Sequence, residues 1–272
     1  MTVKNSRGSD LVWECYDKNG EQWFKSHISL YDFSAINTTD QEVSDKLKKI
    51  LKNAVRQNSE FLSKWNGFKV QTHLEFDKNW GLGSSSSLYA LVGEWADVNP
   101  LVMFFKIENG SGYDVACSAC GEPIMYISSE EEISYTPVSF ENNWTSNLYF
   151  VHLNEKKDSS LGIKEYLKAV KKKKDFVSSI SDISKQMIDA SDLSNFANLM
   201  DKHEDLVAHH TGFKKVKDLH FSDFDGSIKS LGAWGGDFVM VATTQKEDYV
   251  KKYFSDKQYD TLLSFDEMIK IG

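Results

Sequence analysis

The sequence of 272 residues contains only three prolines and three cysteines. So few cysteines exclude a disulfide-rich scaffold, and no linker is obvious, so we expect domains that pack together. No apolar run is long enough to span a membrane, and the N-terminus lacks the apolar stretch of a signal peptide. The 40 acidic residues outnumber the 32 lysines and arginines, and the resulting net charge of −8 argues against non-specific binding to nucleic acid. We therefore expect a cytoplasmic protein with neither a membrane nor a nucleic-acid partner, and the net charge does not exclude an anionic small-molecule substrate.

Two of the three cysteines, Cys117 and Cys120, have the C-x-x-C spacing of a redox motif. A structural zinc site would need a second such pair, which the sequence lacks. The surrounding residues instead favour the interpretation that Cys117 and Cys120 are two small buried thiols.

Hydrophobic residues make up 40% of the chain, enough for a sizeable core. Alternating apolar residues predict strands, and apolar residues three or four apart predict helices. The strands are expected at residues 11–16, 21–30, 70–76, 123–127, 133–140, 148–153, 237–243 and 262–265. The helices are expected at residues 43–62 and 88–95, from residue 99 onward, over most of 161–211, and near 248–254. Thr39 and Glu42 have the spacing of a capping box before the first helix.

A loop of glycine and serine lies between a predicted strand and a predicted helix. Its residues are Gly81, Leu82, Gly83, Ser84, Ser85 and Ser86. Glycines let backbone amides approach a ligand, and a helix N-terminus adds unpaired N–H groups and partial positive charge. These features predict an anion site, although a glycine-serine run is also typical of a flexible tether. The flanking strand and helix favour the anion site, and the lack of a following lysine excludes a Walker A loop.

Two further loops of small residues follow. The first contains Gly110, Ser111 and Gly112, ahead of Tyr113 and Asp114. Phosphoryl transfer needs a carboxylate that orients the acceptor hydroxyl, but aspartates also commonly stabilise turns. The second contains Gly232, Gly235 and Gly236, ahead of a strand. Three such loops in one chain favour a shared function over three independent turns.

The three loops, in this order, resemble the motifs of the galactokinase, homoserine kinase, mevalonate kinase and phosphomevalonate kinase (GHMP) superfamily. The segment Gly112 to Ala116, which reads Gly-Tyr-Asp-Val-Ala, is most similar to the mevalonate and phosphomevalonate kinase branch, especially its GYDIA-type bacterial group. The resemblance covers nearly the whole chain and implies a two-domain α+β fold. Residues 1–145 would form an ATP-binding domain like ribosomal protein S5 domain 2, incomplete at its start. Residues 146–272 would form a ferredoxin-like C-terminal domain.

The resemblance also implies ATP and Mg²⁺ as cofactors and a role for each loop. Asp114 would be the catalytic carboxylate, and Ser85 would be a ligand of Mg²⁺. The ATP phosphates would be held by Gly81, Leu82, Gly83, Ser84, Ser85 and Ser86. The acceptor would be bound by Gly110, Ser111, Gly112, Gly232, Gly235 and Gly236.

The sequence departs from the family pattern in several places. The family's first motif, an early strand with a lysine followed by Gly-Glu, is absent, so we expect an unpaired sheet edge and an exposed core. The usual proline before the phosphate loop is missing, and the glutamate that helps to hold magnesium has no clear counterpart. Trp80 and Trp234 replace small residues in the glycine motifs, which predicts a tighter pocket.

The activity that the resemblance implies is transfer of the γ-phosphoryl group of ATP to mevalonate or phosphomevalonate. Three alternatives stay open. The chain could phosphorylate a sugar, homoserine or another alcohol, or it could resemble diphosphomevalonate decarboxylase. It could also be a truncated, inactive paralogue that binds nucleotide.

Overall fold

The computed structural model describes residues 1–63, 66–129, 132–140, 142–155, 164, 166–168, 174–232, 234 and 237–269. The chain divides into two compact units, Met1–Val138 and Ser139–Gly272, and each has its own sheet and core. Among the helices of these described ranges, none has the length and apolar character needed to cross a lipid bilayer.

The first unit combines one large sheet, a small hairpin and four described helices. Its strands are β1 (Thr2–Ser6), β2 (Asp10–Tyr16), β3 (Gln22–Ser29), β4 (Ala35–Thr38), β5 (Gly67–His73), β6 (Ile124–Ser128) and β7 (Ile133–Pro137). Its helices are α1 (Gln41–Gln57), α2 (Ser84–Ala96), α3 (Pro100–Ile107) and α4 (Tyr113–Cys120).

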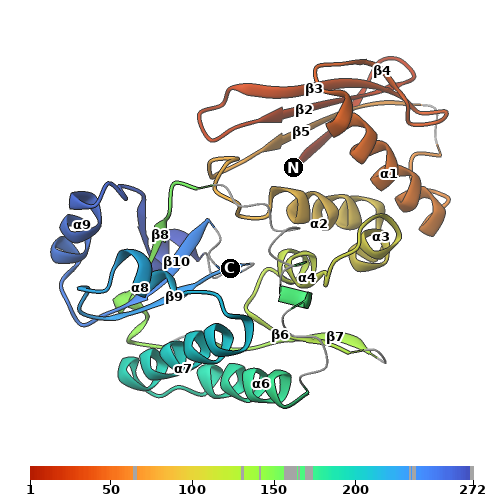
Figure 1. Cartoon of the computed structure of the whole chain (residues 1–272). Helices are drawn as coiled ribbons and strands as arrows, with labels where there is room; N and C mark the ends of the chain where they lie inside the picture. The colour runs from red at the N-terminus through yellow and green to blue at the C-terminus, as the bar shows by residue number, and fades with distance from the viewer. Residues whose placement is uncertain are drawn as a thin grey trace. The chain divides into compact units, whose positions relative to one another are not determined.

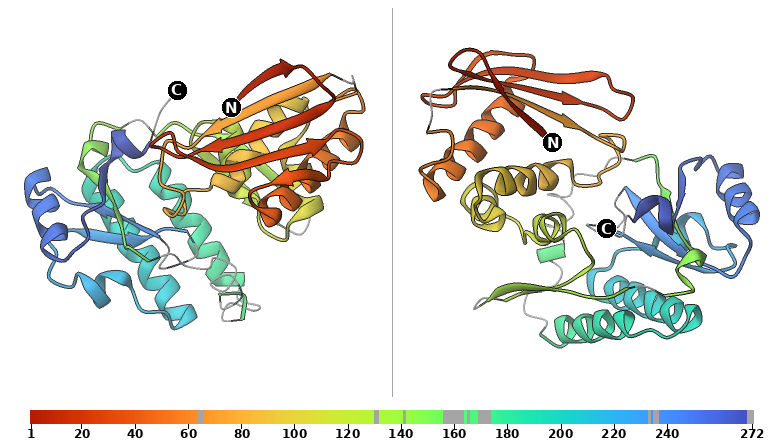
Figure 2. Two further views of the ribbon diagram at one scale, coloured as in Figure 1. Left: turned by 90° about the horizontal axis from the view of Figure 1, so that it is seen from above. Right: turned by 180° about the vertical axis from the view of Figure 1, so that it is seen from behind.

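The large sheet has the strand order β1-β5-β2-β3-β4. Its neighbouring strands are antiparallel except β2 and β5, which are parallel. Helices α1 and α2 lie on the same face of this sheet (Figure 1), as Figure 2 shows from two further sides. The chain order from β2 to α2 is three strands, a helix, a strand and a helix, and this confirms the predicted N-terminal fold.

The first residue of α1 differs slightly from the prediction. Asp40 is the N-cap, and its carboxylate accepts a hydrogen bond of 3.1 Å from the backbone N–H of Val43. The hydroxyl oxygen of Thr39 instead accepts from the backbone N–H of Lys25 at 2.9 Å. The predicted capping box of Thr39 and Glu42 is therefore wrong, because the cross-strand contact to β3 holds Thr39.

The core of the first unit is closed rather than exposed. Trp13, Phe24, Val70 and Tyr89 are all at most 1% exposed, between the sheet and its helices. The strand β1 pairs with β5 along its whole length. The expected gap in the core is therefore absent from the described residues of this unit.

The second unit consists of a four-stranded sheet with helices between its strands. Its strands are β8 (Leu148–His152), β9 (Ser227–Ser230), β10 (Phe238–Ala242) and β11 (Leu262–Ser264). Its helices are η1 (Thr145–Asn147), α6 (Lys174–Ile188), α7 (Leu193–Thr211), α8 (Val216–His220), α9 (Glu247–Asp256) and α10 (Phe265–Met268).

The sheet of the second unit is antiparallel, with the order β11-β8-β10-β9. Numbered within the unit, the order is 4-1-3-2, with helices between the first and second strands and between the third and fourth. This βαββαβ arrangement is ferredoxin-like, as predicted. All five residues of β8 are buried, so the central strand is covered on both faces.

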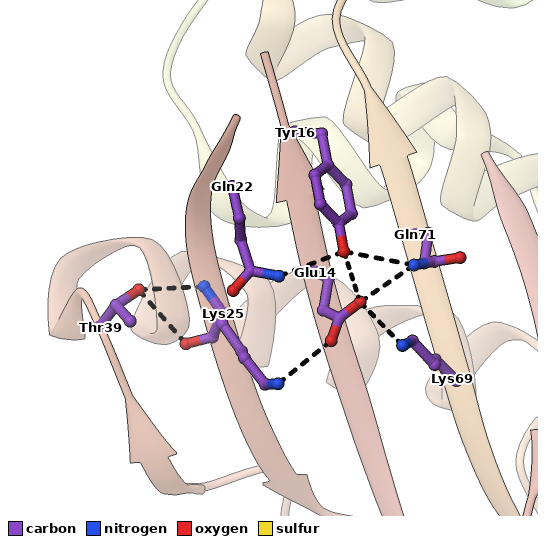
Figure 3. A network of polar contacts seen from close by, with 7 residues as sticks. All are labelled: Glu14, Tyr16, Gln22, Lys25, Thr39, Lys69 and Gln71. Carbon is purple, nitrogen blue, oxygen red and sulfur yellow. Dashed lines mark hydrogen bonds and ion pairs between the residues drawn. The ribbon is translucent and has the colours of Figure 1, made fainter. Parts of the chain in front are cut away.

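The face of the large sheet opposite its helices carries a buried acid. Leu11, Trp13 and Cys15 of β2 belong to the core, so the alternation of a strand turns Glu14 and Tyr16 to the other face. The side chain of Glu14 is nevertheless only 5% exposed. Figure 3 shows how the neighbouring strands enclose it.

Every partner of Glu14 in this network is a donor. Lys69 lies 3.0 Å and Lys25 lies 3.2 Å from its carboxylate oxygens, and Tyr16 and Gln71 donate to it at 2.8 and 3.0 Å. Burial alone would raise the pKa of Glu14, but hydrogen bonds from Lys69, Tyr16, Gln71 and Lys25 outweigh it and lower the pKa to about 2. The charged carboxylate therefore ties β2 to β3 and β5.

We expect Glu14 to make the first unit sensitive to acid. Its pKa is lower folded than unfolded, so its contribution of about 3 kcal/mol is present above the unfolded value and is lost as pH falls from about 5 to about 2. Urea unfolding of wild type and Glu14→Gln across this range should show a stability difference that shrinks as pH falls. Glu21→Gln, at an exposed position beside the same hairpin, is the control. A difference that stays constant with pH would contradict this account.

Candidate active site

The glycine-serine loop ends at the start of α2. Gly83 is the N-cap of this helix, with a left-handed φ of 77°, and it supplies no side chain to cap the helix. Ser84 and Ser85 follow as exposed residues, whereas Ser86 is buried. The first N–H groups of α2 are therefore left without a capping side chain, which favours an anion at this helix end.

The second loop begins α4 in the same way. Gly112 is its N-cap, with a left-handed φ of 75°, and Asp114 lies in the first turn. A Cβ atom on Gly112 would come within 3.0 Å of Leu101 Cδ2 and Phe105 Cζ, so any side chain here would require these neighbours to shift. Tyr126 of β6 donates a hydrogen bond to the carbonyl of Ser111, which links this loop to the hairpin of β6 and β7.

The two loops meet at their helices. The hydroxyl of Ser86 donates a hydrogen bond to Oδ2 of Asp114, while Oδ1 of Asp114 accepts from the backbone N–H of Val115 at 3.0 Å. Helices α2 and α4 pack against each other (Figure 1). The structure therefore brings the predicted phosphate loop and the predicted acid together, and the contact runs through Ser86 rather than Ser85.

The charge of Asp114 affects the pKa values of two tyrosines, Tyr113 and Tyr126. Tyr113 is 52% exposed, but partial desolvation of its phenol raises the pKa of Tyr113, and the negative charge of Asp114 adds to the rise. Burial and the charge of Asp114 raise the pKa of Tyr126 in the same way. Both phenols are protonated at neutral pH, as tyrosines ordinarily are, and can donate hydrogen bonds near the acid.

The third loop lies in the second unit. Gly232 has a left-handed φ of 64° and is exposed, and Leu231 N–H donates to the carbonyl of Phe238 at 3.1 Å, which closes the turn between β9 and β10. Trp234 also has a positive φ, of 54°. Gly235 and Gly236 lie outside the described residues.

A buried ion pair supports the strand that leads into this loop. Glu204 of α7, 1% exposed, lies 3.6 Å from Nζ of Lys229 on β9 and accepts from the hydroxyl of Ser230 at 3.3 Å. Burial raises the pKa of Glu204 to about 7, against the opposing effects of Lys229 and Ser230. Burial also lowers the pKa of Lys229, and of His203 to about 3.

Sequence reasoning missed Ser86 as the partner of Asp114, and it missed the pair of Glu204 and Lys229. For Glu204 a signal exists, because it interrupts an apolar stripe at helical spacing. The buried residues of that stripe in α7 are Phe196, Leu199, Met200, Glu204 and Val207. For Ser86 no local signal distinguishes it from the neighbouring serines.

No protein-family model matches the sequence. No curated protein matches it either.

Solved structures do match. Streptococcus pneumoniae phosphomevalonate kinase, in complex with phosphomevalonate and AMPPNP, is 14% identical with a TM-score of 0.67 over 97% of this chain and 89% of its own. L. major mevalonate kinase, in complex with R-mevalonate, is 14% identical with a TM-score of 0.61 over 96% of this chain and 84% of its own. Lactococcus lactis galactokinase, complexed with galactose, is 13% identical with a TM-score of 0.57 over 96% of this chain and 83% of its own. The chain therefore has the fold of the GHMP kinases, as its motifs predicted.

The glycines at the two ends of α4 allow the packing around Asp114 to be tested. Gly112 and Gly121 have nearly equal φ values of 75° and 74°, but a Cβ on Gly121 would meet nothing within 4 Å. Gly121→Ala should cost about 1–2 kcal/mol, from the left-handed backbone alone. Gly112→Ala should cost about 1–3 kcal/mol more, from overpacking. Equal losses in urea unfolding would show that Gly112 is not packed as described.

The ion pair of α7 and β9 should respond to pH. A carboxyl whose folded pKa is raised destabilises the folded state increasingly as pH rises from its unfolded pKa to its folded pKa. Lys229→Met removes the cation that offsets this penalty, so the variant should lose about 3 kcal/mol at about pH 8 and clearly less at about pH 6. Chemical unfolding at both pH values measures this, with Lys202→Met, at an exposed position on α7, as the control. A loss that does not depend on pH would contradict the assignment to Glu204.

Proposed function

We propose that this chain is an ATP-dependent kinase that transfers the γ-phosphoryl group to the alcohol or phosphate of mevalonate or phosphomevalonate. The observation that carries the proposal is the hydrogen bond from Ser86 to Asp114. It joins a glycine-capped helix start, suited to phosphate, to a carboxylate suited to the acceptor. Phosphoryl transfer consists mainly of positioning and charge stabilisation, and these two elements supply both.

The phosphates of ATP would lie at the first turn of α2. Backbone N–H groups of Gly81, Leu82, Gly83 and Ser84 would donate to phosphate oxygens, and the helix dipole would favour their negative charge. The positive φ values of Gly81 and Gly83, 66° and 77°, turn the backbone without a Cβ in the way. Ser86 is buried and engaged with Asp114, so its part would be to hold the loop against the acid.

A magnesium ion fits this arrangement. Mg²⁺ in kinases keeps several waters and is held by one or two protein oxygens together with substrate phosphates. Ser85 presents an exposed hydroxyl in the first turn of α2, next to the residue that bonds Asp114. Within the described part of the chain no group of three or more His, Cys, Asp or Glu could hold a metal, so the nucleotide would supply most ligands. When bound, the ion would neutralise charge on the transferred group.

Asp114 would receive the acceptor. With an alcohol such as mevalonate, its carboxylate would orient the hydroxyl and accept the proton. With phosphomevalonate the attacking oxygen carries negative charge already, so Asp114 would act through orientation and through its bond to Ser86. The acceptor would lie beside the loop of Gly110, Ser111 and Gly112, at the first turn of α4.

The choice of acceptor rests on two supports. The Gly-Tyr-Asp-Val-Ala segment resembles the mevalonate and phosphomevalonate branch of the superfamily more than its other branches. Solved structures of the same fold were obtained with phosphomevalonate and with mevalonate, although one was obtained with galactose. Mevalonate and phosphomevalonate are therefore the first acceptors to test, and galactose and homoserine are the second.

A transfer assay with radiolabelled ATP, Mg²⁺ and each acceptor tests the proposal. Asp114→Asn should lower kcat/KM by about 100-fold or more, because it removes the carboxylate from the acceptor. Asp97→Asn, at an exposed C-cap on the far end of α2, should change it less than about twofold.

The outcomes separate the parts of the proposal. Transfer to galactose or homoserine alone would keep the kinase and replace the acceptor. Absence of transfer to every acceptor, with ATP binding retained, would reject the kinase in favour of a nucleotide-binding protein. Equal activity of Asp114→Asn and wild type would remove Asp114 from its role.

A further inference from the structure

The proposed function leaves the two cysteines of α4 without a role. Cys117 and Cys120 occupy the last turn of the helix whose first turn carries Asp114. Cys117 is exposed and Cys120 is half-buried, so the expectation of two buried thiols is wrong. Only Cys15, the third cysteine, is buried in the core, and it lies on β2.

The spacing of the pair brings the two thiols close. In an α-helix the Cα atoms of residues three apart are about 5 Å from each other, which is inside the range that a disulfide spans. Their Cβ atoms are about 5–6 Å apart, whereas a disulfide needs about 3.5–4.5 Å, so the turn must tighten to close the bond.

The last turn of α4 has room to tighten. Cys117, Ser118 and Ala119 are exposed, and the C-cap Gly121 has nothing within 4 Å of where a Cβ would stand. Ser118 and Ala119 also line a hollow of about 640 Å³ in the first unit, which is lined as well by α2, by the turn from α2 into α3 and by Tyr135. Val115 and Ala116, by contrast, are fully buried and fix the middle of the helix. The packing therefore holds the start of α4 and leaves its end open.

We propose that Cys117 and Cys120 form a reversible redox site, oxidised by a low-molecular-weight disulfide, and that the internal disulfide switches off the site at Asp114. The switching part rests on the proposed function, whereas formation of the disulfide does not. The two features sit on one helix of eight residues, with Asp114 and Cys117 a single turn apart.

The chemistry is thiol–disulfide exchange in two steps. The Cys117 thiolate attacks one sulfur of the external disulfide, forming a mixed disulfide and releasing one thiolate. The Cys120 thiolate then attacks the Cys117 sulfur, forming the internal disulfide and releasing the second thiolate. Two electrons pass from the cysteine pair to the oxidant, which takes up the two protons and leaves as two thiols. A dithiol reductant reverses both steps.

The physical coupling runs through the helix backbone. Tightening the last turn draws Cys117 toward Cys120, and Cys117 is hydrogen-bonded within the helix to the turn that contains Asp114. Ser86 holds Asp114 through one directed hydrogen bond, which tolerates little displacement. A misplacement of about 1 Å at a positioned catalytic group can cost about 100-fold in rate.

The environment also predicts the pH dependence of the exchange. Although Cys117 is an exposed residue, partial desolvation of its thiol raises the pKa of Cys117, and the neighbouring Cys120 and Asp114 raise it further. The attacking species is the thiolate, so exchange should be slow near neutral pH and should accelerate as pH rises. This dependence distinguishes the pair from an acidic, constitutively reactive cysteine.

The test uses the full chain, reduced with dithiothreitol and then treated with glutathione disulfide at about pH 8.5, where a larger fraction of Cys117 is thiolate. Intact mass should show the loss of two hydrogens, and peptide mapping should place the bond between Cys117 and Cys120. Cys117→Ser and Cys120→Ser should each give a glutathione adduct instead. Cys15→Ser should still form the internal bond.

Three further measurements test whether the internal disulfide changes the site at Asp114. Hydrogen exchange of residues 113–116 should rise in the oxidised protein, phosphoryl transfer should fall by about 100-fold, and dithiothreitol should restore both. Both single serine variants should keep their activity in the presence of the oxidant. Lack of an internal disulfide, or a disulfide with unchanged hydrogen exchange, would overturn the inference. Absence of transfer by the reduced protein would count against the kinase, while mass and hydrogen exchange would still decide the redox site.

Discussion

The hydrogen bond between Ser86 and Asp114 is the contact on which the rest of the site depends. It joins the first turns of α2 and α4, two helices that start from left-handed glycines, Gly83 and Gly112. Each glycine turns the chain sharply into its helix, and so both helix N-termini, with their partial positive charge, come to lie near the carboxylate. The bond makes one site out of a phosphate-type loop and an acid that lie 28 residues apart.

Much of the fold follows from local patterns in the sequence. The hairpin of β2 and β3, the Asn99 cap with Pro100 at the start of α3, and the short apolar runs of β8 and β10 are each signalled by a few neighbouring residues. The short strand β4 carries no such signal, because Ala35 to Thr38 has neither apolar alternation nor strong β-formers throughout. Its place is set by pairing with β3, a tertiary effect that propensity does not contain.

The same distinction between local signals and tertiary effects applies to the residues of the candidate site. The loop of residues 81–86 and Asp114 could be predicted because glycine, serine and aspartate have distinct backbone and charge properties in a motif. The partner of Asp114 could not be predicted, because three serines in a row offer the same hydroxyl and only the packing of α2 on α4 selects Ser86. The buried carboxylates of Glu14 and Glu204 were missed for a related reason. Their lysines come from other strands or from another element, and sequence spacing does not show such neighbours.

The strand order of the second unit has a consequence for how the chain is made. The central strand β8 is the first of its sheet to leave the ribosome, yet its two neighbours are β10 and β11, the last two. At about 5–20 residues per second, β8 waits on the order of ten seconds for β11. Until β10 has been made, β8, with four apolar residues and His152, has neither edge paired, a state in which strands associate with other chains. We therefore expect β8 to be the strand of this sheet that is most open to wrong pairing during synthesis, until β10 and β11 have been made.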